Sequence, residues 1–235
     1  MLAGVTGRPV DLGLSTDQPV GHVMGNWRAF RAAFAPRFPS VVSSHQVHGR
    51  VVQWHPASLD GWLVLDGVDG HATAERGLLL AVTVADCVPV YLTAPGSGTV
   101  ALLHAGWRGT AGGILERGVQ VVMQRASVRA GDLIMHCGVG VCGDCYEVGP
   151  EVVAALAASL PTGAATTALR PGPSGAAHVD LRALLALQAR ALGIGVVGIS
   201  AWCAAHDRDR FFSHRASGGR DGRMVAYAGR PLPPA

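Results

Sequence analysis

The chain has 235 residues, of which 49% are hydrophobic and only 15% charged, a composition that supplies a sizeable core and excludes intrinsic disorder. Its net charge of +3 is too small to indicate nucleic-acid binding, and its apolar runs are too short to span a bilayer. All 19 basic residues are Arg, which excludes a Schiff-base lysine and a P-loop lysine. Because no linker divides the chain and no secretion signal opens it, we predict one cytoplasmic domain over residues 1–235.

The first half of the chain is expected to contain one helix followed mainly by strands. The first ten or so residues have no regular pattern, whereas apolar residues recur at helical spacing over Val20–Phe34. The elements predicted next, in chain order, are an extended stretch Ser40–Trp54 interrupted at His48-Gly49, a loop-rich stretch Asp60–Gly77, and strands Leu78–Val84, Val88–Leu92 and Thr99–His104.

The second half mixes helices and strands without strict alternation. Its predicted elements are a helix Gly109–Arg125, a strand Asp132–Val141, a helix Pro150–Leu160, a mobile surface loop Thr162–Gly175, a helix Asp180–Leu192, a strand Ile194–Trp202, a charged loop Arg208–Gly222 and a strand Met224–Ala228. This mixture favours an α/β (α+β) fold, a layered domain of mixed sheets flanked by helices, over a barrel.

Polar residues interrupt the apolar runs at Cys87 and at His104. If Val88–Leu92 and Thr99–His104 pair as a hairpin, these two residues become neighbours. Asp86 beside Cys87 would oppose thiolate formation unless a metal or an imidazole compensates, so we expect Cys87 to have such a partner. The alternative interpretation is a structural cysteine and a hydrogen-bonded core histidine.

A third candidate comes from the segment Ser43–Gly49, which carries His45 and His48. Their three-residue spacing does not decide which of the two histidines is the site residue, although Gly49 indicates an exposed corner at His48. Together with Cys87 and His104, His48 would complete a Cys/His₂ set. Such a set binds zinc or copper and leaves a fourth position open, as catalytic zinc sites do.

Several other sites have weaker support in the sequence. A four-copper oxidase needs paired His-x-His motifs, which do not occur here. Cys142 and Cys145 form a C-x-x-C, with His136 and Cys137 just upstream, and a structural zinc knuckle or a redox pair is one interpretation. Because no second C-x-x-C and no His pair of zinc-finger spacing follows, we favour incidental loop cysteines. Residues 106–109 lack the spacing of a nucleotide-binding glycine motif.

Arginines near the C-terminus suggest an anion site. Arg215 and Arg223 flank a glycine-rich turn, and Arg binds phosphate bidentately, so we predict that they hold phosphate. Arg8 and Arg108 could join them from other segments. The alternative is a solvated, charged loop.

Taken together, these motifs resemble those of the laccase-domain family, also called multicopper polyphenol oxidoreductases. The matching segments are residues 46–49 (Gln-Val-His-Gly), 85–90 (Ala-Asp-Cys-Val-Pro-Val), 104–109 (His-Ala-Gly-Trp-Arg-Gly), 146–149 (Tyr-Glu-Val-Gly) and two stretches within 211–224. The resemblance implies that His48, rather than His45, joins Cys87 and His104 as the metal-binding and catalytic trio. It also implies a fold similar to that of cytotoxic-necrotizing-factor-like cysteine hydrolases.

Family members are described as purine nucleoside phosphorylases with adenosine deaminase side activity. The resemblance therefore implies small-molecule substrates: adenosine, inosine, guanosine or methylthioadenosine, cleaved with phosphate to the base and a ribose 1-phosphate. Zinc is the implied metal, with copper as the alternative, and neither a nucleic-acid nor a membrane partner is implied. The sequence does not fix the oligomeric state.

Three other functions remain alternatives: a copper-dependent polyphenol oxidase, a Cys87–His104 hydrolase or amidase acting on peptidoglycan precursors, and a non-enzymatic partner protein. One departure from the family bears on phosphate binding. Where the family usually has Ser-Tyr-Arg-Arg-Asp, residues 213–217 read Ser-His-Arg-Ala-Ser. Because Ala216 replaces an arginine, we expect weaker phosphate binding than in relatives that carry it.

Overall fold

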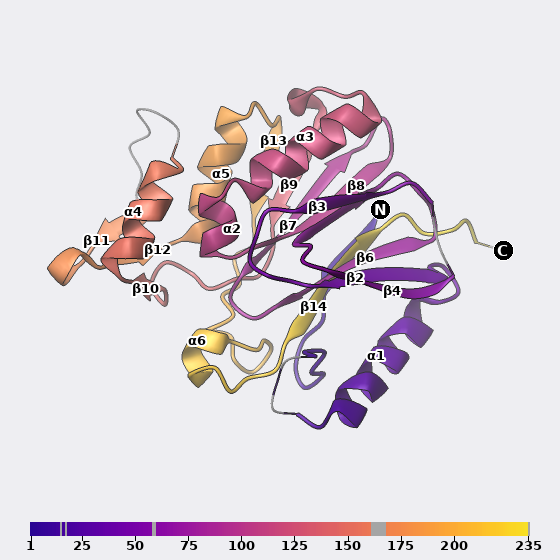
Figure 1. The fold of residues 1–235 in the computed structure, drawn as a ribbon, viewed down its shortest axis with the longest axis horizontal. Coiled ribbons are helices and arrows are strands. Elements are labelled where there is room, and N and C mark those ends of the chain that lie inside the picture. Colours follow the sequence, from indigo (N-terminus) through magenta and orange to yellow (C-terminus); the bar gives the residue numbers. More distant parts are fainter. Residues whose placement is uncertain (15, 17, 58–59, 161–167, 235) are drawn as a thin grey trace.

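The computed structural model describes residues 1–14, 16, 18–57, 60–160 and 168–234 (Figure 1). One sheet, in the order β1-β14-β6-β2-β4, consists of β1 (Leu2–Val5), β2 (Ser40–His45), β4 (Gly61–Asp66), β6 (Leu78–Val84) and β14 (Met224–Gly229). A second, in the order β13-β9-β7-β8-β5-β3, consists of β3 (Val52–His55), β5 (Gly70–Thr73), β7 (Val88–Ala94), β8 (Thr99–Ala105), β9 (Ile134–Cys137) and β13 (Val196–Ile199).

A small third sheet, six α-helices and two short 3-10 helices, Ala130–Asp132 and Pro173–Gly175, are the other elements of the described residues. The third sheet is formed by β10 (Glu147–Val148), β11 (Leu169–Pro171) and β12 (Ala177–Val179). The helices are α1 (Val20–Phe34), α2 (Trp107–Ala111), α3 (Ile114–Ala126), α4 (Pro150–Ala158), α5 (Leu181–Ala191) and α6 (His214–Ser217).

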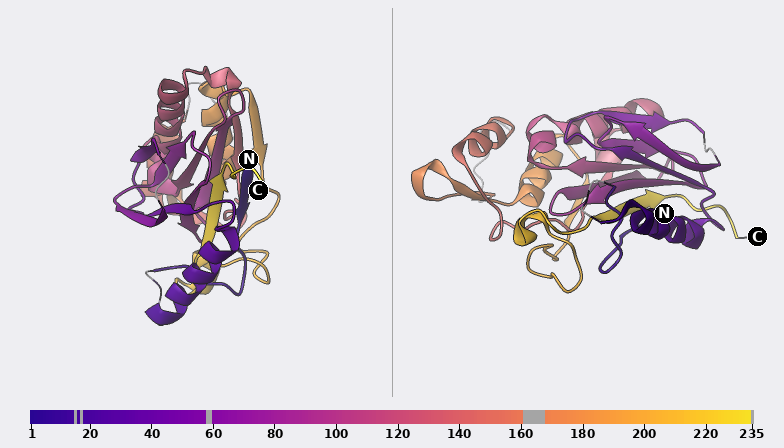
Figure 2. Two further views of the ribbon diagram at one scale, coloured as in Figure 1. Left: turned by 90° about the vertical axis from the view of Figure 1, so that its right-hand side faces the viewer. Right: turned by 60° about the horizontal axis from the view of Figure 1, so that its bottom comes forward.

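The two large sheets pack face to face, with α3 and α5 outside the second sheet and α1 outside the first (Figures 1 and 2). The alternation of side chains along β6 shows why this stacking forms. Leu80 and Val82 point into the core between the sheets, whereas Leu79 and Ala81 point into the core beneath α1. The predicted layered α/β domain of mixed sheets flanked by helices is confirmed.

The helix α1 follows the sequence prediction because its apolar residues share one face. Val23, Trp27 and Phe30 are buried against the first sheet. The Trp27 indole stacks on Trp62 of β4 and donates a hydrogen bond of 2.9 Å to the carbonyl of Leu12.

Several predicted boundaries are wrong. The N-terminal residues that lacked a pattern form β1, which gains its order by pairing with β14 at the other end of the chain. The loop-rich stretch Asp60–Gly77 contains β4 and β5. The helix predicted over Gly109–Arg125 is two helices, because Gly113 adopts a left-handed φ of 84° between them.

The predicted loop Thr162–Gly175 falls partly on residues 161–167, which lie outside the described residues; beyond them, Leu169–Pro171 forms β11. Within the described chain, no helix combines the length and apolar character needed to cross a membrane. The assignment of residues 1–235 to one domain stays a prediction.

Two connections between the sheets prepare the functional site. The chain leaves β2 in the first sheet and enters β3 in the second, and it does the same between β6 and β7. The passage from β6 to β7 lies beside the last residues of β8, because Val88 at the start of β7 pairs with Ala105 at the end of β8. The passage from β2 to β3 reaches the same end of the sandwich, since it carries His48, which lies beside Cys87 and His104.

Candidate functional site

The three predicted ligands His48, Cys87 and His104 come together where the chain passes between the sheets. Their ligand atoms all lie within 4.8 Å of one another. The predicted hairpin of β7 and β8 is confirmed, with Pro89 opposite His104, and this pairing makes Cys87 and His104 neighbours. The rings of His48 and His104 meet edge to face, with centroids 4.8 Å apart.

Unusual backbone geometry displays two of these side chains. His48 has a φ of 59°, and Asp86, directly before Cys87, has a φ of 82°. Left-handed conformations are costly for residues other than glycine and concentrate at functional sites, where surrounding contacts hold them. At Asp86 the backbone N–H of Arg215 supplies such a contact, donating to the carboxylate over 2.6 Å.

Glycine at position 106 permits the close approach of the trio. A Cβ atom added at Gly106 would lie 2.9 Å from Cys87 Sγ, closer than real Cβ contacts come, and 3.0 Å from His48 Cδ2, tighter than most of them. The glycine that follows His104 and Ala105 is therefore required by packing at the site, which explains why the His-Ala-Gly segment carries it.

Asp69 orients His104 and was not predicted from the sequence. Its carboxylate is fully buried and accepts a hydrogen bond of 2.9 Å from Nδ1 of His104. It also accepts backbone N–H bonds from Val47, His48 and Gly49 over 3.2, 3.0 and 2.7 Å, so it holds the turn that carries His48. Because Nδ1 of His104 is engaged, Nε2 remains for Cys87 or a metal ion.

The charges of this group support one another. Burial works against the charged form of Asp69, but the bonds from His104 and the backbone N–H groups hold the pKa of its carboxyl below the usual value. Burial alone would raise the pKa of Cys87, yet the imidazoles of His104 and His48 lower it to about 6. In the same way, the pKa of His104 rises to about 9 despite burial, because Cys87 and Asp69 favour the imidazolium. The site favours a thiolate, the form that attacks electrophiles and binds metals.

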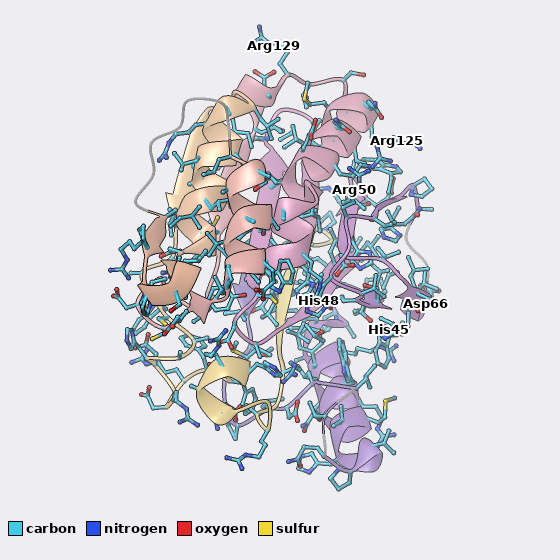
Figure 3. All side chains as sticks on the ribbon, turned by 60° about the vertical axis from the view of Figure 1, so that its left-hand side comes forward. His45, His48, Arg50, Asp66, Arg125 and Arg129 are labelled. Carbon is cyan, nitrogen blue, oxygen red and sulfur yellow. The ribbon has the colours of Figure 1, made fainter. Side chains whose placement is uncertain are left out.

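His45 and His48, which spacing could not separate, lie apart in the structure. His45 is exposed, and its Nδ1 lies within hydrogen-bonding distance, 2.8 Å, of the Asp66 carboxylate (Figure 3). His48 is set apart from that pair and belongs to the group with Cys87 and His104.

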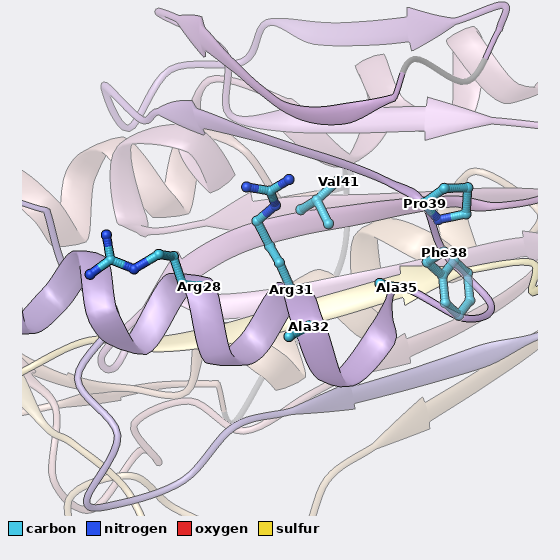
Figure 4. A pocket seen from close by; sticks show the side chains of 7 residues that line it. All are labelled: Arg28, Arg31, Ala32, Ala35, Phe38, Pro39 and Val41. Atoms are coloured by element: carbon cyan, nitrogen blue, oxygen red, sulfur yellow. The ribbon is translucent and has the colours of Figure 1, made fainter.

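The trio opens into a cavity of about 570 Å³, a volume suited to a small organic ligand. Its wall carries Arg108 and Arg223, together with the hydroxyls of Ser43, Ser44 and Thr83. A second cavity, of about 260 Å³, lies where Arg31 of α1 points toward Val41 of β2 (Figure 4). Its lining includes no cysteine, histidine or carboxylate.

The structure treats the four predicted arginines differently. Arg108 and Arg223 line the large cavity, where Arg108 lies 4.5 Å above the ring of Trp107. Arg8 instead pairs with the carboxylate of Asp221. The Arg215 guanidinium donates to the carbonyl of Glu147 over 2.8 Å, outside the cavity lining.

Tyr146 connects Arg215 to the site. The guanidinium carbon of Arg215 lies 5.0 Å from the centre of the Tyr146 ring. Burial raises the pKa of Tyr146 to about 12, and the nearby charge of Cys87 acts in the same direction, whereas Arg215 opposes it. Arg215 is thus close enough to act on the site's electrostatics without lining the cavity.

Comparison with known proteins identifies the family. A family model described as multi-copper polyphenol oxidoreductase laccase matches residues 4–230. The chain belongs to this laccase-domain family. The predicted resemblance is confirmed.

Relatives in the laccase-domain family include proteins with named activities. The purine nucleoside phosphorylase YlmD of Geobacillus stearothermophilus is 35% identical over 94% of this chain and 83% of the relative. The adenosine deaminase RL5, from an unknown prokaryotic organism, is 37% identical over 68% of this chain and 61% of the relative. These names indicate an enzyme with phosphorylase-like or deaminase-like activity.

Solved structures of the family share this fold. The crystal structure of YlmD from G. stearothermophilus superposes with a TM-score of 0.92, at 33% identity, over 98% of this chain and 92% of that one. The Bacillus licheniformis hypothetical protein YfiH gives a TM-score of 0.86, at 27% identity, over 97% of this chain and 89% of that one. The expected likeness to cytotoxic-necrotizing-factor-like hydrolases stays a prediction.

Proposed function

We propose that this protein is a purine nucleoside phosphorylase that cleaves adenosine, inosine, guanosine or methylthioadenosine with phosphate. The proposal rests on the cavity of about 570 Å³, which is lined both by the Cys/His₂ trio and by two arginines, Arg108 and Arg223. A nucleoside and an anion fit such a combination, and relatives named purine nucleoside phosphorylase support it.

Arg108 and Arg223 are the proposed phosphate contacts. The Arg223 guanidinium donates to the carbonyls of Asp221 and Gly222 over 2.7 and 3.0 Å, which fixes its direction, and among the described residues it forms no ion pair with a carboxylate. Fixed positive charge holds the attacking phosphate against the sugar carbon as the glycosidic bond breaks. Arg8 and Arg215 have a supporting place in this proposal, Arg8 by holding Asp221 and Arg215 by holding Tyr146.

The donor set of His48, Cys87 and His104 fits a zinc ion, with copper as the alternative. Its two imidazoles and one thiol lie within 4.8 Å of one another and line the cavity, so these three residues would hold the ion beside a bound substrate. When bound there, zinc would act as a Lewis acid and would lower the pKa of water. Asp69 keeps His104 in the tautomer and orientation that such a ligand needs.

Adenosine deamination is a second proposed activity of the same cavity. The adenosine deaminase RL5 supports it, and the trio supplies groups that can move protons at the C6 position of adenine. Deamination requires no phosphate, so it would depend on the trio but not on the arginines.

Two further chemistries follow from specific observations. The lowered pKa of Cys87, beside His104, suits a Cys–His hydrolase or amidase. The family's description suggests a copper-dependent polyphenol oxidase. A single three-ligand site makes multi-electron oxygen chemistry harder to account for, so we rank the oxidase below phosphorolysis. All five cysteines are free thiols, which supports the proposed cytoplasmic location.

The phosphate requirement tests the proposal. Purified protein is incubated with inosine, and hypoxanthine release is followed with and without phosphate. We expect release that depends on phosphate and yields ribose 1-phosphate. Base release at the same rate without phosphate, or phenol oxidation that rises with added copper while inosine stays intact, would contradict it.

A further inference from the structure

A second group of cysteines and histidine lies outside the cavity. Cys142 and Cys145 are in the loop between β9 and β10, and Cys203 and His206 are in the segment between β13 and α6. Their ligand atoms also lie within 4.8 Å of one another. We call these four residues the C-terminal cluster, and none of them lines the cavity of the trio.

Backbone contacts hold the two segments of the C-terminal cluster together. Gly140 forms a bridge with Cys203, and the N–H of Ala204 donates to the carbonyl of Gly140 over 3.0 Å. The N–H of Cys142 donates to Cys203 Sγ over 3.3 Å, and the N–H of Cys145 closes a turn on the carbonyl of Cys142. An N–H aimed at sulfur stabilises a thiolate, which is the form that binds metal.

The sulfur–nitrogen distances within the cluster are close to those of a tetrahedral zinc site. Cys142 Sγ lies 3.6 Å from His206 Nδ1, and Cys145 Sγ lies 3.1 Å from His206 Nε2. With Zn–S bonds of about 2.3 Å and Zn–N bonds of about 2.0 Å, a tetrahedron places sulfur and nitrogen roughly 3.5 Å apart. The two thiols approach different nitrogens of the His206 ring, so zinc binding would require the ring to turn until one nitrogen faces a common centre.

The ligand atoms of the cluster indicate a zinc ion rather than a disulfide. Three thiols and one imidazole form a complete four-ligand set, which in proteins is typical of structural zinc. A disulfide between Cys142 and Cys145 would use only two of the four groups and would leave Cys203 and His206 without a reason to be adjacent. We propose that Cys142, Cys145, Cys203 and His206 bind a structural zinc ion.

The position of the cluster indicates a structural role for the proposed zinc ion. The N–H of Val141 donates to the carbonyl of Asp86, the residue before Cys87, over 2.9 Å. Cys145 directly precedes Tyr146, whose ring lies under Arg215. Zinc would therefore cross-link two loops that support the cavity wall, without contacting the cavity itself.

Metal analysis of paired variants tests the proposal. Because the trio can also bind metal, the test starts from the His48→Ala/Cys87→Ala/His104→Ala variant, purified under reducing conditions and reconstituted with zinc. We expect it to retain about one zinc ion per chain. Adding Cys142→Ser and Cys145→Ser should remove that zinc, whereas adding Cys137→Ala, which deletes a buried thiol outside the cluster, should not.

His206 supplies a conservative substitution. His206→Cys, which makes a four-thiol set, should retain zinc, and His206→Ala should release it to a competing chelator at least tenfold faster. Zinc retained by the Cys142→Ser/Cys145→Ser variant, or absent from the reconstituted trio variant, would overturn the proposal.

A second measurement uses the unmodified protein and so does not depend on how variants fold. Alkylation followed by peptide mass mapping reports the reactivity of each cysteine. Cys142 and Cys145 should be protected with zinc and become at least tenfold more reactive after chelation. Equal reactivity in both conditions, or a Cys142–Cys145 disulfide in reduced and zinc-reconstituted protein, would count against zinc binding.

Discussion

The two Cys/His groups of this protein contain similar atoms in different surroundings. In the trio, His104 is buried, Asp69 fixes its ring, and a cavity of about 570 Å³ opens beside Cys87. In the C-terminal cluster, four donors come from two loops, and none of the four lines a cavity found in the described chain. The nearest cavity, of about 340 Å³, is lined by Asp144 between the two loop cysteines and by Arg170, Pro171 and His178. Ligand number and access to open space, rather than residue type, distinguish a site suited to chemistry from one suited to cross-linking.

The contacts around each group support this distinction. The carboxylate of Asp69 accepts four hydrogen bonds from described residues, and three of them come from the turn that carries His48, so the trio is oriented by a buried charge. The cluster is assembled by main-chain contacts such as the Gly140–Cys203 bridge. The first arrangement tunes reactivity, whereas the second fixes the relative position of two segments.

Removing a thiol from each group provides the strongest test. Cys87→Ala should lower kcat/KM for inosine phosphorolysis by about 10³-fold, because a reactive group beside the cavity is lost. Cys142→Ala should change kcat/KM by less than about threefold, since the cluster does not line the cavity. Steady-state kinetics on both variants, with circular dichroism to establish folding, would measure this. Equal losses would mean that the two groups form one functional unit.

The buried carboxylate should matter more than the exposed one. Asp69→Asn should reduce kcat by about 10–100-fold, as expected when the residue that orients a metal-binding histidine is replaced. The matched control is Asp66→Asn, which removes the exposed partner of His45 and should leave kcat within about twofold. If the two substitutions had the same effect, the orienting role of Asp69 would be wrong.

Thermal stability, unlike activity, should depend more on the C-terminal cluster than on the trio. Removing metal from the cluster by Cys145→Ser should lower the Tm by roughly 5–10 °C, because metal binding there contributes to folding free energy. His48→Ala removes one of three donors at the trio, on an exposed turn, and leaves the buried contact between His104 and Asp69 in place, so it should shift the Tm by less than about 3 °C. Thermal unfolding of zinc-reconstituted samples would compare them. A larger shift for His48→Ala would reverse the assignment of structural and chemical roles.

The sequence predicted the trio better than the cluster for a physical reason. Apolar strands on either side of Cys87 and before His104 predicted the β7–β8 hairpin, and local pairing then brought the two residues together. His48 required the family resemblance, because its left-handed turn is not visible in spacing alone. The cluster was missed because Cys203-Ala-Ala-His206 lies about sixty residues beyond Cys142, and only tertiary packing joins them.

The fold shows the same limit. The sequence predicts a loop where β5 forms, because Gly70, His71 and Thr73 do not make up an apolar run. All of β5 is nevertheless buried. Its polar side chains have partners on β3: Nδ1 of His71 lies 3.1 Å from Nε2 of His55, and the Thr73 hydroxyl donates to the carbonyl of His55. Hydrogen bonds to another strand satisfy these polar groups, and such partners cannot be read from one segment.

The smallest expected effect separates two arginines beside the cavity. Arg223 lines the cavity and has no carboxylate partner in the described part of the chain, so a contact with phosphate should be worth roughly 1.5–3 kcal/mol. Arg223→Ala should therefore raise the phosphate KM about tenfold or more. Arg215→Ala should raise it by less than about threefold, because that guanidinium is committed to Glu147 and the Tyr146 ring.

Adenosine deamination serves as the internal control for both arginine substitutions. It consumes no phosphate, so Arg223→Ala should leave its rate within about twofold while the phosphate KM rises. If Arg223→Ala reduced deamination and phosphorolysis equally, Arg223 would shape the shared cavity rather than bind phosphate. If Arg215→Ala had the larger effect on phosphate KM, Arg215 would turn into the cavity when phosphate binds. The anion site would then be formed by the segment that the C-terminal cluster holds in place, and removing zinc from the cluster should raise the phosphate KM as well.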